Sequence, residues 1–163
     1  MLSLVSVALT PACARPPIIV TPDPLAAIVQ DSIEIRLLRG DGDIVTIPLE
    51  HYVRGTVLAE VPLGSLPINA AITVAEVQAI MARTYAVYHR GRHSKDGFDL
   101  CSTTHCQMHR ETTGITPLLQ GVIDRAMEET NAKVIVYDGL PIEALFHADC
   151  GGATSSAKSV WGG

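Results

Sequence analysis

The chain has 163 residues and a formal net charge of −5, and 47% of its residues are hydrophobic while 18% are charged. This length fits one domain, and the composition is far from that of a disordered chain. Because no run of Lys or Arg occurs, nucleic acid is a poor candidate for the partner. After the first residues, no stretch is long and apolar enough to span a bilayer.

Residues 1–14 predict a signal peptide. An apolar stretch over 2–9 ends at Ala12-Cys13-Ala14, which has the A-x-A pattern of a cleavage site, although a basic start is missing. We therefore expect an exported protein of the cell envelope or periplasm. The alternatives are lipid attachment at Cys13 and a frayed apolar N-terminus.

The prolines that follow indicate a linker over 15–30, and the domain is expected over 31–163, incomplete at its C-terminus. Alternating apolar residues over 32–37, a turn at Asp41-Gly42 and a second apolar run over 44–47 predict a β-hairpin.

Helices are predicted over 49–59 and 70–89. Pro48 suits the first turn of the first helix, and Pro62 stops it. Asn69 is a candidate cap for the second helix. Apolar residues on more than one face predict that this second helix is largely buried.

A polar loop over 91–114 follows, and loops of this length in compact domains are usually functional or held by something. A third helix is predicted over 118–130, and a second hairpin over 133–137 and 142–147. The order of elements predicts an α+β fold, a single domain with antiparallel β-hairpins packed on a long buried helix and a metal-pinned loop.

Metal-ligand residue types gather in this loop. Three of them fall within six residues: Cys101, His105 and Cys106. Thiolates and imidazoles are the preferred ligands of a structural zinc ion, which needs four of them. The candidates for the fourth ligand are His93, His147 and Cys150. A Cys101–Cys106 disulfide, a disulfide from Cys150, and free thiols are the alternatives.

Glu60 lies among apolar residues in the segment 55–62. A desolvated carboxyl group can keep its proton at neutral pH and donate it to a leaving oxygen; an exposed glutamate at a helix end is the alternative. Arg83, in an alanine-rich helix, needs a partner. Glu60 or an anionic or amide group of a ligand would serve, and a structural salt bridge is the alternative.

Four ordered segments resemble the stage II sporulation protein D (SpoIID) / LytB amidase-enhancer family. They are GTVLAEVP over 55–62, QAIMARTY over 78–85, DLCSTTHCQ over 99–107 and FHADCGGAT over 146–154. The chain departs from the family pattern in being longer between Glu60 and Gln78, and in having Leu66 where the family has a tryptophan.

The resemblance implies a bacterial cell-wall protein of the sporulation type, a lytic transglycosylase that acts on peptidoglycan glycan strands without stem peptides and stimulates a cell-wall amidase. It implies that Glu60 is the catalytic acid. It also implies a zinc site, whose ligands would be Cys101, His105, Cys106 and His93.

Candidate substrate-binding residues follow from this hypothesis. Arg83 and Tyr85 would support the groove, and Ser102, Thr104 and Gln107 would hydrogen-bond N-acetyl groups. Two other hypotheses stay open. One is a non-catalytic peptidoglycan-binding module that enhances an amidase, and the other is a zinc amidase or peptidase, which needs an open metal position.

Overall fold

The computed structural model describes residues 33–147 and 152–161. The predicted signal peptide over 1–14, the linker over 15–30 and Cys150 lie outside the described residues. Within the part of the chain that the structure describes, no helix is long and apolar enough to cross a membrane.

The described residues form a mixed helix and strand fold, which confirms a single α+β domain. In chain order the elements are β1 (Glu34–Leu38), β2 (Ile44–Pro48), α2 (Leu49–Glu60), the 3-10 helix η1 (Leu63–Ser65), α3 (Ile68–Tyr88), the 3-10 helix η2 (Ser94–Asp96), β3 (Leu100–Cys101), α4 (Pro117–Glu129), β4 (Val136–Tyr137), β5 (Leu140–Pro141) and α5 (Ala157–Trp161).

The first hairpin forms as predicted, with β1 antiparallel to β2. A feature that was not predicted is β3, which pairs in parallel with the other edge of β1, so that Leu38 lies opposite Cys101. Ile35 and Leu37 of β1 are fully buried, which fixes its register against the core. The sheet therefore carries Cys101 to a defined place beside the core.

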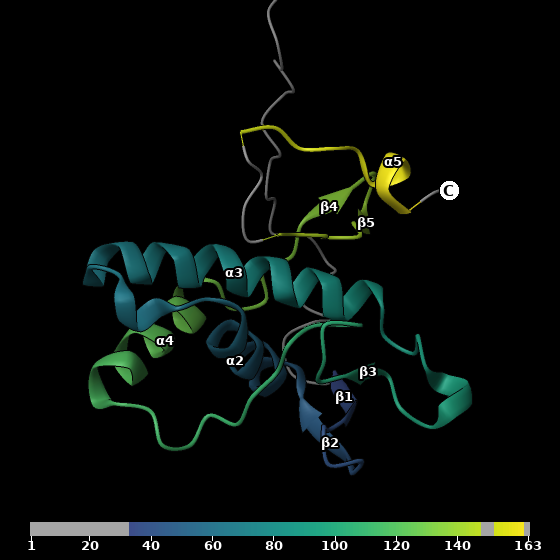
Figure 1. The fold of residues 1–163 in the computed structure, drawn as a ribbon, viewed down its shortest axis with the longest axis horizontal. Helices are drawn as coiled ribbons and strands as arrows, with labels where there is room; N and C mark the ends of the chain where they lie inside the picture. The colour runs from purple at the N-terminus through teal and green to yellow at the C-terminus, as the bar shows by residue number, and fades with distance from the viewer. Residues whose placement is uncertain (1–32, 148–151, 162–163) are drawn as a thin grey trace, which may run out of the picture.

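The helix α3 crosses both α2 and α4, and the small hairpin β4–β5 lies on its other side (Figure 1). Its buried face is largely alanine, at Ala71, Ala75, Ala79, Ala82 and Ala86. Alanines three to four residues apart share a helix face and allow neighbouring helices to approach closely. Pro67, rather than Asn69, precedes the first turn.

Arg83 is fully buried in α3, and its partner is Glu50 of α2, not Glu60. The guanidinium Nε and Nη2 donate to the two carboxylate oxygens of Glu50, each at 2.6 Å, and Nη1 donates to the backbone oxygen of Lys133 at 3.1 Å. A buried charge of this kind is stable only when it is fully paired. Arg83 has no surface for a glycan, so its predicted place in a substrate groove is corrected to a structural one.

Candidate metal centre and carboxylate

The metal-ligand loop is anchored to β1 by Asp99, which is 5% exposed. Asp99 accepts hydrogen bonds from the Arg36 guanidinium at 2.9 and 3.2 Å and from the Arg36 backbone N–H at 2.8 Å. Burial acts to raise the pKa of Asp99, but these bonds outweigh it and lower the pKa below its usual value. Three residues on, the Ser102 N–H donates to the Leu38 oxygen at 2.9 Å, which extends the anchor.

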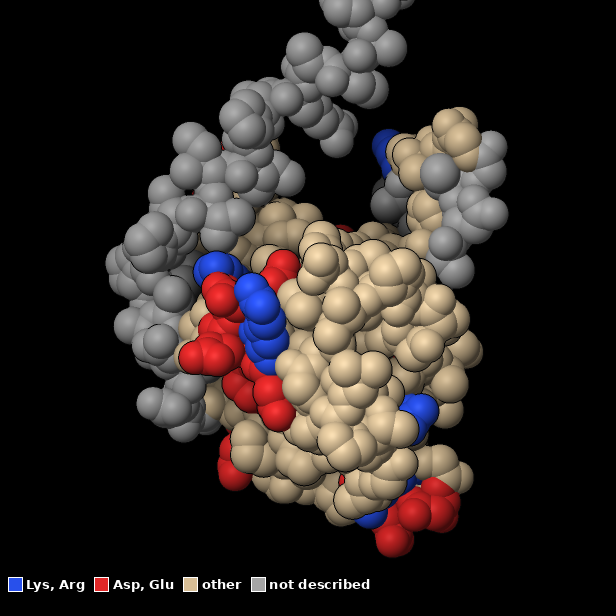
Figure 2. Space-filling view, turned by 90° about the vertical axis from the view of Figure 1, so that its left-hand side faces the viewer, with Lys and Arg blue, Asp and Glu red and all other residues tan. Residues whose placement is uncertain are grey.

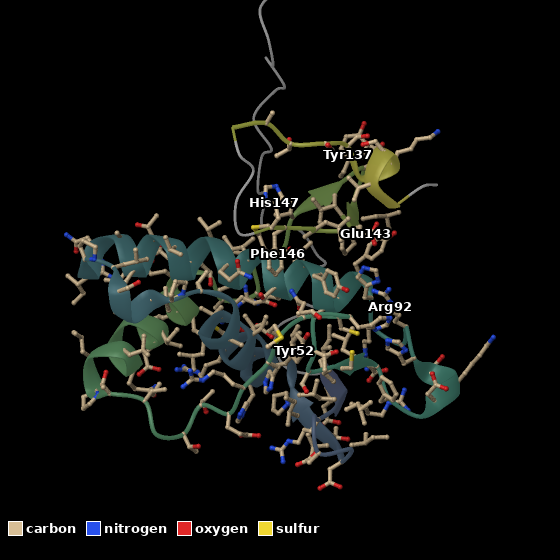
Figure 3. The ribbon with its side chains drawn as sticks, viewed as in Figure 1. Tyr52, Arg92, Tyr137, Glu143, Phe146 and His147 are labelled. Carbon is tan, nitrogen blue, oxygen red and sulfur yellow. The ribbon has the colours of Figure 1, made fainter. Side chains whose placement is uncertain are left out.

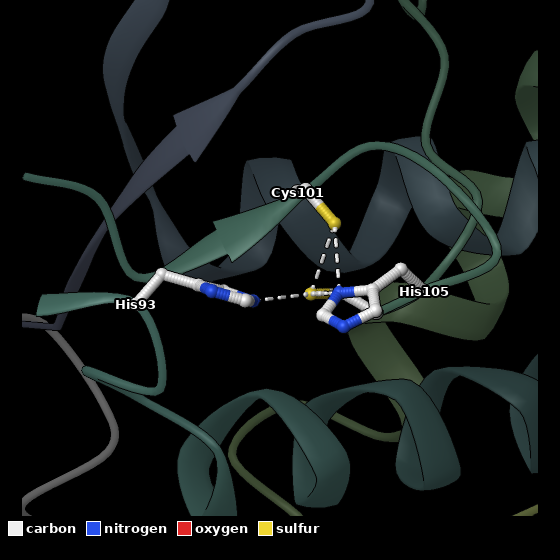
Figure 4. A group of neighbouring side chains, drawn as sticks. His93, Cys101 and His105 are labelled. Atoms are coloured by element: carbon white, nitrogen blue, oxygen red, sulfur yellow. Dashed lines mark hydrogen bonds between the residues drawn. The ribbon is translucent and has the colours of Figure 1, made fainter. Parts of the chain in front are cut away.

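Four side chains converge at this loop: His93, Cys101, His105 and Cys106. Their ligand atoms all lie within 4.8 Å of one another (Figure 4). The Sγ of Cys106 is 3.4 Å from Nε2 of His93 and 3.6 Å from Nδ1 of His105, and Cys101 Sγ is also 3.6 Å from that Nδ1. Two thiols and two imidazoles in this arrangement form a group that can hold one metal ion.

Cys101 and Cys106 are free cysteines, with their sulfur atoms 3.1 Å apart. Burial disfavours the Cys101 thiolate, yet hydrogen bonds from Thr103, Cys106 and His105 outweigh it and lower the pKa of Cys101. Burial and the neighbouring Cys101 charge raise the pKa of Cys106. One thiol of the pair therefore ionises readily, and a cation beside both would favour ionisation of the second.

Of the two candidates for the fourth ligand that lie in the described residues, His93 belongs to the group and His147 does not. His93 lies at the start of η2 and stacks on Phe98, with ring centroids 4.6 Å apart, so its ring is held toward the group. His147 is exposed and does not belong to the group; Figure 3 places it on the opposite side of α3 from Tyr52. Cys150 lies outside the described residues.

Glu60 is the last residue of α2 and is half-buried. Its Oε1 accepts a hydrogen bond of 2.7 Å from the backbone N–H of Met108, two residues beyond the candidate metal ligand Cys106. This bond could not be predicted from local sequence patterns, because it joins residues that are 48 positions apart. The metal loop and the candidate acid are thus parts of one arrangement.

Segment 107–110 rests on α2 where Gly55 lies. A Cβ added at Gly55 would meet the His109 ring and lie 2.6 Å from the Arg110 backbone oxygen. Only glycine therefore permits this approach of the loop to the helix.

We expect Gly55→Ala to lower the free energy of unfolding by about 1–3 kcal/mol, because the added methyl group forces the loop away from α2. Gly121→Ala is the matched control, since a Cβ at this position in α4 meets nothing within 4 Å. Urea unfolding of both variants measures the effect. Equal stability of Gly55→Ala and wild type would contradict the close approach.

The ring of His109 stacks on Tyr52, with centroids 5.5 Å apart, and burial lowers the pKa of His109 to about 4. A histidine in the unfolded chain has a pKa of about 6.5. Between this pKa and that of the folded chain, the unfolded chain therefore binds a proton that the folded chain does not. We expect the free energy of unfolding to fall by about 1–2 kcal/mol from pH 6.5 to 5 through this residue.

The variant His109→Phe keeps an aromatic ring beside Tyr52 and removes the titration. Urea unfolding of wild type and His109→Phe at pH 6.5 and 5 measures the effect. The metal ligands contribute equally to both proteins, so their contribution cancels in the difference. A smaller loss of stability in His109→Phe is the expected outcome, and an identical loss would show that His109 does not titrate in this window.

The other predicted substrate-binding residues differ in how far their side chains are exposed to solvent. Tyr85 is buried, and its hydroxyl oxygen accepts a hydrogen bond of 3.0 Å from Arg92. Gln107 is 2% exposed, and its Oε1 accepts a bond of 3.0 Å from the Tyr52 hydroxyl. Ser102 is half-buried and Thr104 is exposed. Of these residues, Thr104 is the most open to a polymer outside the domain.

A polar hollow of about 650 Å³ lies between α2 and α4, lined by side chains that include Glu50, Arg54 and Asp124, and it does not include Glu60. Figure 2 shows acidic and basic side chains together in one group at the left and another at the lower right, with a broad surface without charge between them. The face in view therefore carries no extended patch of a single sign.

The fold and the site define a small α+β domain whose two-cysteine, two-histidine loop lies against the end of a helix. The family model of the stage II sporulation protein, SpoIID, matches residues 40–137. The chain belongs to the SpoIID family.

Its relatives include an uncharacterized protein of Brachyspira hyodysenteriae, which is 33% identical over 70% of this chain and 29% of its own length. The stage II sporulation protein D of Bacillus subtilis is 28% identical over 72% of this chain and 36% of its own length. That of Bacillus amyloliquefaciens is 27% identical over the same shares. The chain thus spans about a third of the length of these relatives.

Proposed function

We propose that this domain remodels peptidoglycan as a lytic transglycosylase, with Glu60 as its acid and base. The observation that carries the proposal is the bond from the Met108 N–H to the Glu60 carboxylate at the metal loop. The bond gives this half-buried carboxyl group a defined orientation, which a general acid needs for proton transfer. The family supports the cell wall as the setting.

The reaction cleaves the β-1,4 bond between N-acetylmuramic acid and N-acetylglucosamine. Glu60 donates its proton to the glycosidic oxygen as the bond from that oxygen to C1 breaks. The resulting carboxylate then takes the proton of the muramic C6 hydroxyl, whose oxygen bonds to C1 and closes a 1,6-anhydro ring. No water is consumed, and Glu60 ends protonated.

A single carboxylate suffices because the nucleophile belongs to the substrate. Ordinary glycosidases instead use two carboxyl groups, roughly 5–5.5 Å apart in retaining enzymes and 6.5–9.5 Å apart in inverting ones. Glu60, whose Oε1 accepts the Met108 N–H, is the carboxyl group that this one-carboxylate scheme uses.

We further propose that the metal is a structural zinc ion. In a tetrahedron with Zn–S of about 2.3 Å and Zn–N of about 2.1 Å, sulfur and nitrogen lie roughly 3.6 Å apart. Three of the four sulfur–nitrogen separations are 3.4, 3.6 and 3.6 Å. The two sulfur atoms, 3.1 Å apart, would have to separate to about 3.8 Å around the ion. Four protein ligands would fill such a site, which leaves no open position for the water of a zinc amidase or peptidase. The ion would hold the loop in its fold.

Action on glycan strands also requires export, for which the A-x-A pattern at residues 12–14 is the supporting feature. We propose a location in the cell envelope or periplasm.

A second candidate function is a non-catalytic module that binds peptidoglycan and enhances a cell-wall amidase. The observation that favours it is the position of the polar hollow, which lies between α2 and α4 and does not include Glu60. In that case Glu60 would be dispensable.

The experiment that decides between them uses the wild-type protein, peptide-free glycan strands and mass spectrometry of the products. Lytic transglycosylase activity gives fragments that end in 1,6-anhydromuramic acid, lighter by one water than hydrolysis products. Binding of strands without cleavage, together with faster amidase action when the two proteins are mixed, would overturn the proposal in favour of the enhancer module.

A further inference from the structure

Tyr52 contacts segment 107–110 at two points. Its hydroxyl donates a hydrogen bond of 3.0 Å to Oε1 of Gln107. Its ring stacks on that of His109, with centroids 5.5 Å apart and planes inclined by 13°. A third contact joins the same helix to the segment, because the Arg110 N–H donates to the Gly55 oxygen at 3.3 Å. Segment 107–110 is therefore held along α2.

Met108 lies between the two residues that Tyr52 contacts. Its N–H, which donates to Glu60 Oε1 at 2.7 Å, belongs to the planar peptide unit that joins Gln107 to Met108. Because the unit is rigid, the position of Gln107 helps to set the direction of the N–H bond. A displaced Gln107 would turn this donor away from the carboxylate.

The Tyr52–Gln107 hydrogen bond is buried, since Tyr52 is 0% and Gln107 2% exposed. Burial raises the pKa of Tyr52 far above its ordinary value, so the hydroxyl keeps its proton and remains a donor. Water does not compete for a bond in such a place, and its loss leaves the amide oxygen of Gln107 without a partner. The bond is therefore well suited to fix the loop.

We propose that Tyr52 is a positioning residue for Glu60, acting through Gln107 and the Met108 N–H. The same helix, α2, would thus present the carboxylate and, about two turns earlier, hold the peptide that orients it. The inference rests on the proposed function of Glu60 and adds to it the residue that orients the acid. It also gives Gln107 a role different from contact with N-acetyl groups.

The test uses Tyr52→Phe, which keeps the stacked ring and removes the donor. We expect kcat on peptide-free glycan strands to fall about tenfold with KM within about twofold, because orientation of the acid matters to the chemical step and not to binding. Hydrogen exchange of the Met108 amide, followed by NMR, becomes faster. Metal content stays at the wild-type level.

Gln107→Met removes the acceptor of the same bond and is the second variant. If the two residues act through one bond, the double variant loses no more kcat than either single variant. Thr130→Val is the matched control, since it removes another buried hydroxyl, whose bond of 2.7 Å goes to the Ala126 oxygen within α4. This control should leave kcat and Met108 exchange unchanged.

Additive losses in the double variant, or wild-type kcat and Met108 exchange in Tyr52→Phe, would overturn the proposal. A wild-type protein that does not cleave glycans would refute the proposed function separately. In that event Met108 exchange still decides whether Tyr52 holds the N–H: faster exchange supports the positioning contact, and unchanged exchange overturns it.

Discussion

Glu60→Gln is expected to reduce glycan cleavage by about 10³-fold or more, because the amide can neither donate the proton to the leaving oxygen nor take it from the C6 hydroxyl. The amide oxygen of the variant can still accept the Met108 N–H, so the fold and glycan binding should persist. Rates of anhydromuramic product formation by the two proteins measure the effect.

Glu60→Ala serves as the comparison, because it removes the acid and also leaves the Met108 N–H without its acceptor. We expect the same loss of activity and a lower unfolding midpoint than in Glu60→Gln. Substantial cleavage by Glu60→Gln would show that another group is the acid, and the function would then have to be sought elsewhere on the domain.

Removal of the metal is the second change with a large expected effect. Chelation, or the variant Cys106→Ser, should lower the free energy of unfolding by several kcal/mol and the unfolding temperature by about 10 °C, because binding to a site that exists only in the folded chain stabilises the fold. Activity should fall with it, since Met108 follows the ligand segment directly. Thermal melting measures the unfolding temperature, metal analysis measures the bound ion, and the rate of anhydromuramic product formation measures the activity.

A comparison of two histidine variants tests which residue is the fourth ligand. His93→Ala should lose the metal, whereas His147→Ala should retain one ion per chain, because only His93 belongs to the convergent group. Loss of the ion in His147→Ala with retention in His93→Ala would contradict the proposed ligand set.

The helices could be predicted closely from local signals. The helix expected over 49–59 is α2, Leu49–Glu60, and that expected over 118–130 is α4, Pro117–Glu129. Prolines and apolar spacing mark such boundaries because they act within a few residues. The first hairpin was predictable for the same reason, through its alternation and its Asp41-Gly42 turn.

Long-range pairing was not predictable in this way. The strand β3 has only two residues, and its parallel partner β1 lies 63 positions away. The second hairpin was predicted only in part. Its first strand, β4, keeps two residues of the range 133–137, but its second strand, β5 (Leu140–Pro141), comes before the predicted range 142–147, which contains no strand. The partner of Arg83 was misjudged for the same reason, since composition indicates that a buried cation needs a carboxylate but not which one.

The candidate site also contains residues that local sequence patterns predict and residues that they do not. The cysteines and histidines could be found from their spacing, and the group of four contains the predicted His93. The residues that connect this group to Glu60 gave no signal, because Met108 acts through its backbone and Tyr52 looks like any aromatic residue on a buried helix face.

We propose that the loop of His93, Cys101, His105 and Cys106, once it binds zinc, holds the carboxylate of Glu60. Hydrogen exchange of the Met108 amide in zinc-loaded and zinc-free protein, under folding conditions, tests this directly. We expect slow exchange with zinc and much faster exchange without it, while amides in the middle of α3 stay protected in both. Equally slow exchange of Met108 in the two forms would show that the loop does not need the metal to hold Glu60.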